Sequence, residues 1–128
     1  MIYCTLLNPS IDLIYTIENF APGTTQRDVP LGMYPAGKGV NVASVVRILG
    51  EEVCVTGVMP ERDAHRFTAC LEARGIEHHF FSTPGDVRSN VTIIEQKDGV
   101  VTHLNSASPA HQSRRPVVLY RKPAGGVR

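Results

Sequence analysis

The sequence has no excess of charge of either sign. Thirteen lysine and arginine residues stand against 12 aspartate and glutamate residues among 128, so the formal net charge is +1 and both signs are scattered along the chain. Proteins that bind nucleic acid or an anionic membrane usually carry a basic face, and this sequence shows none. We therefore expect no nucleic-acid partner and no membrane partner, and a small molecule as the ligand.

Long apolar runs are missing as well. No stretch approaches the roughly 20 apolar residues that cross a bilayer, and the N-terminus lacks the basic and apolar regions of a signal peptide. We therefore expect a cytoplasmic protein. A chain of 128 residues, 42% of them hydrophobic, is enough for one domain with a modest core.

Cysteine is scarce, and residues that bind metals do not cluster in the sequence. Cys4, Cys54 and Cys70 are odd in number, far apart and in apolar surroundings, so we expect buried, reduced thiols and neither a disulfide framework nor a metal site. His78 and His79 are adjacent, so in a strand they face opposite sides and cannot bind one ion together. We interpret both histidines as structural.

The most informative stretch is residues 33–50, where a glycine-bounded turn leads into a helical pattern. Apolar residues recur at the spacing of one helix face, and Gly50 stands where a helix usually stops. This pattern predicts a helix that begins near Asn41. The residues expected on its buried face are Val42, Val45, Val46 and Leu49.

The turn itself has a composition that suits ligand binding. Gly37 and Gly39 can adopt positive φ and let another molecule approach the backbone, which directs the free amides of the first helical turn outward beside Lys38. Such a place suits an anion or a hydroxyl-rich ligand. The structural alternative is a glycine turn with a solvated lysine before a core helix.

Short apolar runs alternate with helical patterns along much of the chain. Residues 2–7, 53–59 and 76–83 are predicted strands, the first buried on both faces, and residues 63–74 a helix that ends at Gly75. Connections this short imply right-handed crossovers and a parallel sheet. The helix side expected to pack on the sheet carries Phe67, Cys70, Leu71 and Arg74.

Other segments predict a small second sheet that projects from the main domain. Residues 13–20 and 26–34 have strand-like composition, and residues 89–96 and 100–104 flank an Asp-Gly turn typical of a β-hairpin. Asp12 follows the predicted end of the first strand, where ligands bind in open α/β sheets. An aspartate at this place can bind a ligand, but it can also stabilise a turn.

Three motifs occur in the order found in a known family. They are residues 7–12 (Leu-Asn-Pro-Ser-Ile-Asp), 37–43 (Gly-Lys-Gly-Val-Asn-Val-Ala) and 88–90 (Arg-Ser-Asn). In them the chain resembles the N-terminal half of a ribokinase-like (PfkB-family) sugar kinase, and most of all the 1-phosphofructokinase and tagatose-6-phosphate kinase branch. Ala36 and Val87 depart from this branch, which usually has glycine and threonine at these positions. The resemblance runs from Met1 to about Ser108.

The resemblance implies an α/β fold: part of a ribokinase-like domain in residues 1–108, with a parallel sheet, flanking helices and a β lid formed by residues 13–35 and 88–105. It also implies that Arg88 binds the phosphate of a sugar phosphate, since a planar guanidinium holds two phosphate oxygens at once. Arg27 stands where the branch often has a phosphate-binding arginine, but it could also be an exposed lid residue. The substrate-binding residues implied are Asp12, Arg27, Gly37, Lys38, Gly39, Asn41, Arg88 and Asn90.

ATP and Mg²⁺ are the cofactors that the resemblance implies. The family places their contacts, and the aspartate that deprotonates the sugar hydroxyl, in a second half whose motifs this sequence does not contain. We therefore assign no catalytic residue and no metal ligand, and we expect the chain alone to be inactive. A parallel sheet that stops this early has a bare edge, so we also expect self-association through that edge or the lid strands.

Residues 109–128 do not follow the family pattern. They have no amphipathic period and a local excess of basic residues, which fits a solvated or artefactual end better than a tail for an acidic partner. If residues 119–125 were encoded CTG TAC CGG AAG CCT GCC GGG, a start one base later gives Cys-Thr-Gly-Ser-Leu-Pro, which is the family turn expected further on. Our hypothesis is a deletion with a frameshift in a kinase gene or gene model.

The sequence leaves several functions open. The first is a kinase for a ketohexose phosphate, of which this chain carries the sugar-binding half. The glycine turn also occurs in ribokinases, so a ribokinase or nucleoside-type kinase is the alternative within the same class. Outside that class are a noncatalytic module that binds sugar phosphates and a truncated product without function.

Overall fold

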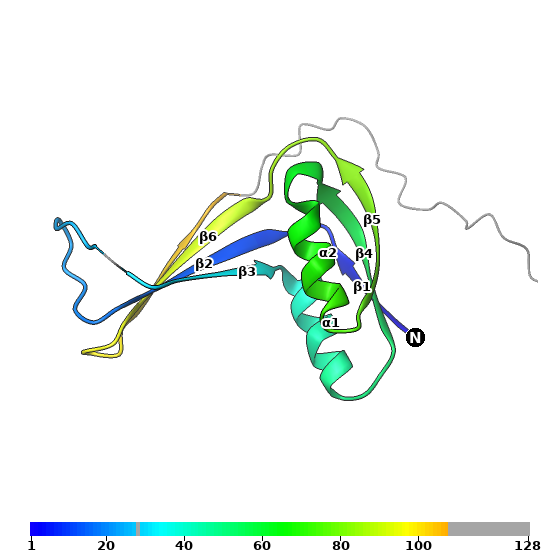
Figure 1. Cartoon of the computed structure of the whole chain (residues 1–128), viewed down its shortest axis with the longest axis horizontal. Coiled ribbons are helices and arrows are strands. Elements are labelled where there is room, and N and C mark those ends of the chain that lie inside the picture. Colours follow the sequence, from blue (N-terminus) through cyan, green and yellow to red (C-terminus); the bar gives the residue numbers. More distant parts are fainter. Residues whose placement is uncertain (28, 108–128) are drawn as a thin grey trace, which may run out of the picture.

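The computed structural model describes residues 1–27 and 29–107, which form two β-sheets and two α-helices (Figure 1). The three-stranded sheet, here the core sheet, has the order β1-β4-β5, and the four-stranded sheet, here the lid, has the order β3-β2-β6-β7. The tail predicted for residues 109–128, with its frameshift hypothesis, lies outside the described residues. The elements are β1 Ile2–Leu6, β2 Ser10–Ile17, β3 Leu31–Ala36, α1 Lys38–Ile48, β4 Val53–Pro60, η1 Glu61–Asp63, α2 Ala64–Glu72, β5 Glu77–Thr83, β6 Arg88–Glu95 and β7 Val101–Asn105.

The core sheet is parallel, as predicted, and both helices pack on the same face of it. Phe67 and Leu71 of α2 are fully buried against apolar side chains of alternate strand positions, and Val40 and Ala43 of α1 join them. Alternate residues of a strand point to opposite faces, so one face of each strand forms this core. The sheet residues of the core include Cys4, Leu6, Val53, Val55 and Met59.

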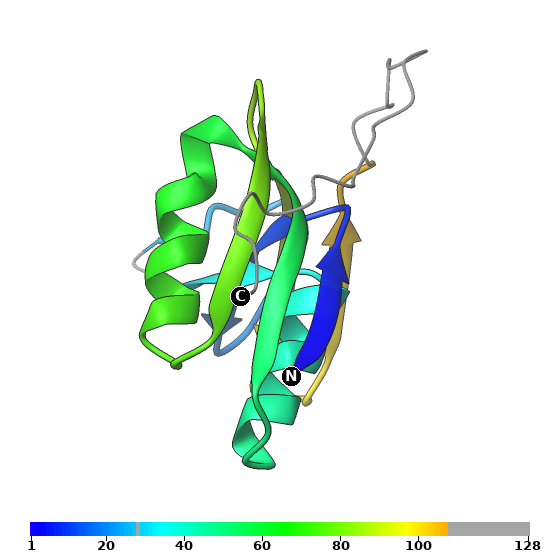
Figure 2. The ribbon, with the colours of Figure 1, turned by 90° about the vertical axis from the view of Figure 1, so that its right-hand side faces the viewer.

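The opposite face of the core sheet is open in the described part of the chain (Figure 2). The prediction that the first strand is buried on both faces is therefore wrong. Cys4 and Leu6 are buried, whereas Tyr3 and Thr5 are exposed. The apolar run was a poor guide here because β1 is an edge strand with helices on one side only.

Helix α1 begins and packs differently from the prediction. It starts at Lys38, three residues before Asn41, directly after the N-cap residue Gly37. Its buried residues are Gly39, Val40 and Ala43. Of the four residues predicted on the buried face, Val46 packs partly against the core, and Val42, Val45 and Leu49 are 52%, 57% and 75% exposed.

Small residues explain which face of α1 is buried. A Cβ on Gly39 would lie 2.6 Å from the carbonyl oxygen of Thr5, so α1 contacts β1 more closely there than a side chain would allow. The face of α1 with Gly39 and Ala43 therefore packs on the sheet, although the face with Val42 and Val45 is more apolar. The predicted end of the helix is confirmed, because Gly50 follows the C-cap residue Leu49 with a φ of 91°.

The remaining core elements follow the predictions in order and approximate bounds, but Arg74, expected on the side of the helix that packs on the sheet, is exposed. The helix predicted for residues 63–74 is the short η1 turn followed by α2, and it ends before Gly75, whose φ is 63°. The strands predicted at 53–59 and 76–83 are β4 and β5. Cys4 and Cys54 are buried free thiols as expected, and Cys70 is a half-buried one.

The lid projects away from the helices (Figure 1). Strand β2 lies inside it, antiparallel to β3 and parallel to β6, and β6 forms the predicted hairpin with β7. The first lid strand begins at Ser10 and not at residue 13, and the second is Leu31–Ala36 and not 26–34. Asp12 therefore lies within β2 and not in a loop after β1, because only three residues separate the two strands.

Candidate functional site

Three of the predicted site residues, Asp12, Arg88 and Asn90, lie with Ser10 where the lid meets the core. Strands β2 and β6 pair in parallel register there, with Ser10 opposite Arg88 and Asp12 opposite Asn90. Residues that pair in register and residues two apart point to the same face of a sheet. Ser10, Asp12, Arg88 and Asn90 consequently share one face at the base of the lid.

Hydrogen bonds join three of these side chains into what we name the Asp12–Asn90–Arg88 network. Nδ2 of Asn90 donates to Oδ1 of Asp12 at 3.0 Å, and Nη1 of Arg88 donates to Oδ1 of Asn90 at 3.2 Å. Ser10 Oγ also donates to Oδ1 of Asp12, at 3.3 Å. Within the described residues, these bonds use only one of the two carboxylate oxygens, which leaves the second to accept from a ligand hydroxyl.

The guanidinium of Arg88 has unmet capacity to donate. Nη1 also donates to the backbone oxygen of Ser106 at 3.2 Å. Nε is buried and has no hydrogen-bond partner among the described residues. A buried donor without a partner is costly, so this atom calls for an acceptor such as a phosphate oxygen.

Residues that sequence reasoning missed hold the segment before Arg88. Oδ2 of Asp63 accepts from the backbone N–H of Val87 at 3.0 Å. Arg62 pairs with Asp86 through Nη1, at 2.9 and 3.1 Å from its two carboxylate oxygens. The η1 turn therefore positions the entry to β6. No sequence signal marks these contacts, since they join residues 24 apart.

The start of α1 follows directly from the end of β3, whose residue Ala36 pairs with Ser10. The first intrahelical bond runs from the N–H of Asn41 to the oxygen of Gly37, so the amides of Lys38, Gly39 and Val40 have no helical partner. Together with the helix dipole, these amides favour an anion. Lys38 and Asn41 are exposed, and among the described residues neither forms a hydrogen bond or ion pair with the Asp12–Asn90–Arg88 network.

The two glycines of the turn have a packing role in this structure. Gly37 has the predicted positive φ, at 126°, and a Cβ on it would lie 2.6 Å from Cδ1 of Leu6. Gly39 lies inside α1 and does not use the positive φ that a glycine allows. The missing side chains of both glycines face β1 and the residues after it, so their direct effect is to seat α1 against the sheet.

Arg27 is not brought to the network. It is exposed and lies in the connection between β2 and β3, and it forms no hydrogen bond or ion pair with another described residue. β2 runs outward from Ser10 to Ile17, so this connection lies beyond the end of β2 that is remote from Asp12. The role of Arg27 stays a prediction.

Comparison with known proteins decides the family. The sequence profile of the pfkB family of carbohydrate kinases matches residues 5–119. The chain belongs to this family. It is 34% identical to 1-phosphofructokinase of Vibrio cholerae and 37% identical to that of Escherichia coli K12, over 99 residues in each case. These matches cover 77% of the chain but only 31% of each relative, so the chain spans about a third of their length.

Solved structures show the same fold for this family member. Phosphofructokinase-2 from Escherichia coli in complex with fructose-6-phosphate superposes with a TM-score of 0.76 at 19% identity, over 84% of this chain and 35% of that one. Ribokinase from Giardia lamblia gives a TM-score of 0.67 at 15% identity, over 82% and 35%. The predicted partial ribokinase-like fold is therefore confirmed. In the described part of the chain, no helix is long and apolar enough to span a membrane.

Proposed function

We propose that this chain is the sugar-phosphate-binding half of a kinase that transfers phosphate to a ketohexose phosphate, as the name 1-phosphofructokinase implies for its relatives. The observation that carries the proposal is the Asp12–Asn90–Arg88 network with the buried, unpartnered Nε of Arg88. The carboxylate of Asp12 can accept hydrogen bonds from sugar hydroxyls, and the guanidinium of Arg88 can bind a phosphate. Together the two groups match the two ends of a sugar phosphate. We propose residues 1–108 as one structural unit and a cytoplasmic location.

The roles of the site residues follow from their placement. Asp12 binds sugar hydroxyls, Asn90 orients both its neighbours, and Arg88 binds the phosphate already present on the sugar. The start of α1 also binds the sugar phosphate, through the exposed side chains of Lys38 and Asn41 and the free amides of its first turn. Gly37 and Gly39 keep that turn packed closely on β1. Arg27 contacts the phosphate only if the connection between β2 and β3 bends toward the base of the lid.

Phosphoryl transfer needs correctly positioned reactants and neutralised phosphate charge. In kinases, Mg²⁺ bound with ATP neutralises that charge. The site described here offers one carboxylate and cationic side chains, and this donor set does not fit Mg²⁺, which takes oxygen ligands. We therefore assign no step of the transfer to these residues. ATP and Mg²⁺ belong to the family's activity, and we propose that the 128 residues alone bind sugar phosphate without transferring phosphate.

Self-association belongs to the same proposal. The outer strands of the lid expose large apolar side chains, and an exposed strand edge favours pairing with another chain. The residues concerned are Leu31, Met33, Tyr34, Val101 and Leu104. A tetrameric form has been described for phosphofructokinase-2 from Escherichia coli. We propose a second copy of this chain as the partner, through the lid or through the open edge of β1.

Titration calorimetry tests the function. The full chain is titrated with fructose 1-phosphate, tagatose 6-phosphate and unphosphorylated fructose. Arg88→Ala should weaken binding of a sugar phosphate by about 1.5–3 kcal/mol, the range for a hydrogen bond to a charged group, and Asp12→Asn should weaken it less. Arg47→Ala, an exposed cation in the last turn of α1, is the control and should bind like the parent.

The outcomes separate the alternatives. No specific heat with any sugar phosphate contradicts the proposal and favours a product without function. Preference for the unphosphorylated sugar favours a ribokinase-type site. Binding that Arg88→Ala leaves unchanged means that the Asp12–Asn90–Arg88 network is not the site.

A further inference from the structure

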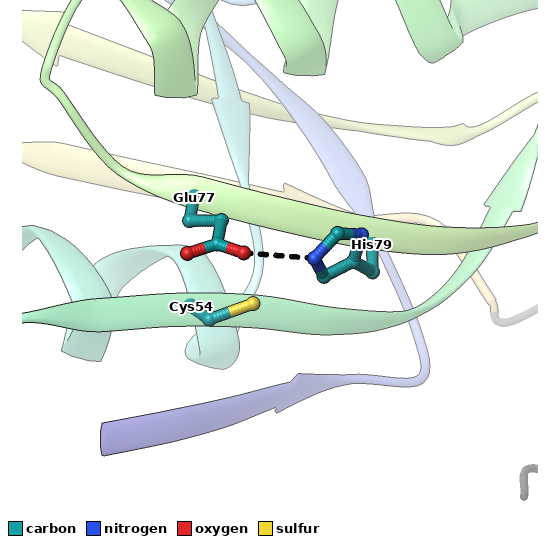
Figure 3. Close-up of side chains that lie close together, drawn as sticks. All are labelled: Cys54, Glu77 and His79. Carbon is teal, nitrogen blue, oxygen red and sulfur yellow. Dashed lines mark hydrogen bonds and ion pairs between the residues drawn. The ribbon is translucent and has the colours of Figure 1, made fainter. Parts of the chain in front are cut away.

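Three side chains of metal-binding type meet on the open face of the core sheet (Figure 3). Glu77 and His79 occupy alternate positions of β5, so both point to one face. Cys54 lies on the neighbouring strand β4 in register with Glu77. One donor atom from each side chain lies within 4.8 Å of the other two.

Burial and pairing at this place favour a cation. Cys54 is fully buried, whereas the side chains of Glu77 and His79 are 51% and 71% exposed, so two of the three donor side chains are open to solvent. Nε2 of His79 and Oε1 of Glu77 lie 2.9 Å apart. Both atoms are therefore already directed toward each other beside the sulfur atom, as Figure 3 shows.

We propose that Cys54, Glu77 and His79 bind a divalent transition-metal ion of the zinc type. A thiolate, an imidazole nitrogen and a carboxylate oxygen are the donors that Zn²⁺ prefers, and three protein ligands leave the fourth tetrahedral position for a water molecule. On binding, the Cys54 thiol releases its proton to solvent and the ion takes the place of the Glu77–His79 contact. The site lies on the face of the sheet opposite the helices and is separate from the proposed sugar-phosphate site.

The charge balance around the sulfur disfavours a thiolate when no cation is bound. Burial, then the carboxylate of Glu77 and the nearby Cys4, raises the pKa of the Cys54 thiol, because each disfavours a negative charge on the sulfur. A bound cation reverses this balance, since it neutralises the thiolate and the carboxylate together.

Neighbouring residues supply matched controls. His78 faces the other side of β5, where its ring stacks on Phe80 with centroids 5.6 Å apart and its Nε2 lies 3.5 Å from Glu72. His78 and His79 thus face opposite sides, as predicted, and only His79 belongs to the cluster. Cys70 on α2 is a second free thiol outside it.

Titration of the reduced full chain with Co²⁺ tests the proposal. A tetrahedral site with a thiolate ligand gives a sulfur-to-cobalt charge-transfer band and intense visible bands, which Zn²⁺ should then displace. Cys54→Ser should abolish the charge-transfer band. Loss of a residue that only hydrogen-bonds to a metal ligand weakens metal binding by roughly 10–100-fold. His79→Gln and Glu77→Gln each remove a ligand itself, so each should weaken Co²⁺ binding by at least that factor. His78→Gln and Cys70→Ser should bind Co²⁺ like the parent.

Several results would overturn the proposal. They are the absence of a charge-transfer band at equimolar Co²⁺, a band that survives Cys54→Ser, and a band that His79→Gln does not weaken. Since Cys54 is buried and its variant can lose structure, far-ultraviolet circular dichroism accompanies each titration. The exposed His79→Gln variant keeps the test decisive even if Cys54→Ser does not fold.

Discussion

The core sheet and the lid are stabilised in different ways. The largest fully buried side chains, including Phe67, Leu6 and Met59, all belong to the core sheet and its helices. In the lid, most side chains of β2 and β6 are half-buried and those of β7 are all exposed. Burial of apolar area is the main source of stability, so it supports the core sheet far more than the lid.

The lid depends instead on backbone pairing and a few polar contacts. Strand β2 pairs along its length with β6 and over six residues with β3. Structures held by exposed hydrogen bonds open more readily than packed cores. The comparison teaches that Asp12, Asn90 and Arg88 lie on the softer sheet but at its base, where it joins the rigid one.

The largest effect should come from the core. Phe67→Ala removes a fully buried ring between α2 and the sheet, and truncations of this kind cost about 3–5 kcal/mol in free energy of unfolding. Ile93→Ala in the half-buried middle of β6 should cost only about 1 kcal/mol, since less apolar area is lost. Urea denaturation of both variants measures the difference, and equal losses would contradict the contrast between the sheets.

The next effect should be confined to the lid. Glu95 is buried at the end of β6, where its two carboxylate oxygens accept from the N–H groups of Lys97 and Asp98 at 3.0 and 2.9 Å. Glu95→Ala should destabilise the β6–β7 hairpin by about 1.5–3 kcal/mol, the range for hydrogen bonds to charged groups. Hydrogen exchange should show faster exchange in β7 and unchanged exchange in β4.

A matched substitution sharpens this prediction. Glu95→Gln keeps one acceptor oxygen at the same place, so it should have a smaller effect on exchange in β7 than Glu95→Ala. If Glu95→Ala lowered protection in β4 as much as in β7, the lid and the core sheet would unfold as one unit and the contrast between them would be wrong.

Local patterns predicted the order of the elements well. Alternating strands and helices with short connections identified the parallel core sheet, and the turn at Asp98 and Gly99 identified the hairpin. The ends of both helices were marked by Gly50 and Gly75. These features depend on neighbouring residues alone, which is why the sequence displays them.

Features that depend on contacts between distant segments were not predictable in this way. The buried face of α1 is set by the close approach of Gly39 to Thr5 and not by the apolar side with Val42 and Val45. Likewise, a metal-type cluster was not expected, because Cys54 meets Glu77 and His79 only through the register of β4 and β5. The family resemblance implied that Asp12 and Arg88 both bind the substrate. The pairing of β2 with β6 brings these two residues together at the base of the lid.

The smallest effect tests the junction between the two sheets. Asp63 precedes α2 on the rigid core, and its carboxylate accepts from the N–H of Val87, one residue before Arg88. Asp63→Ala leaves this half-buried N–H without its acceptor, which should cost about 1 kcal/mol in stability. It should also weaken binding of fructose 1-phosphate, because Arg88 then has a less fixed starting position.

Arg62→Ala is the control for this last prediction, because it removes a neighbouring contact to Asp86 between two side chains that are 73% and 59% exposed. Exposed ion pairs contribute about 0.2–1 kcal/mol to stability. Removing this pair leaves the hydrogen bond from the N–H of Val87 to Asp63 in place. Calorimetry with sugar phosphate and with unphosphorylated sugar distinguishes the two roles. A positioning role predicts that Asp63→Ala weakens binding of the phosphorylated sugar more than that of the unphosphorylated one, whereas a merely structural role weakens both equally.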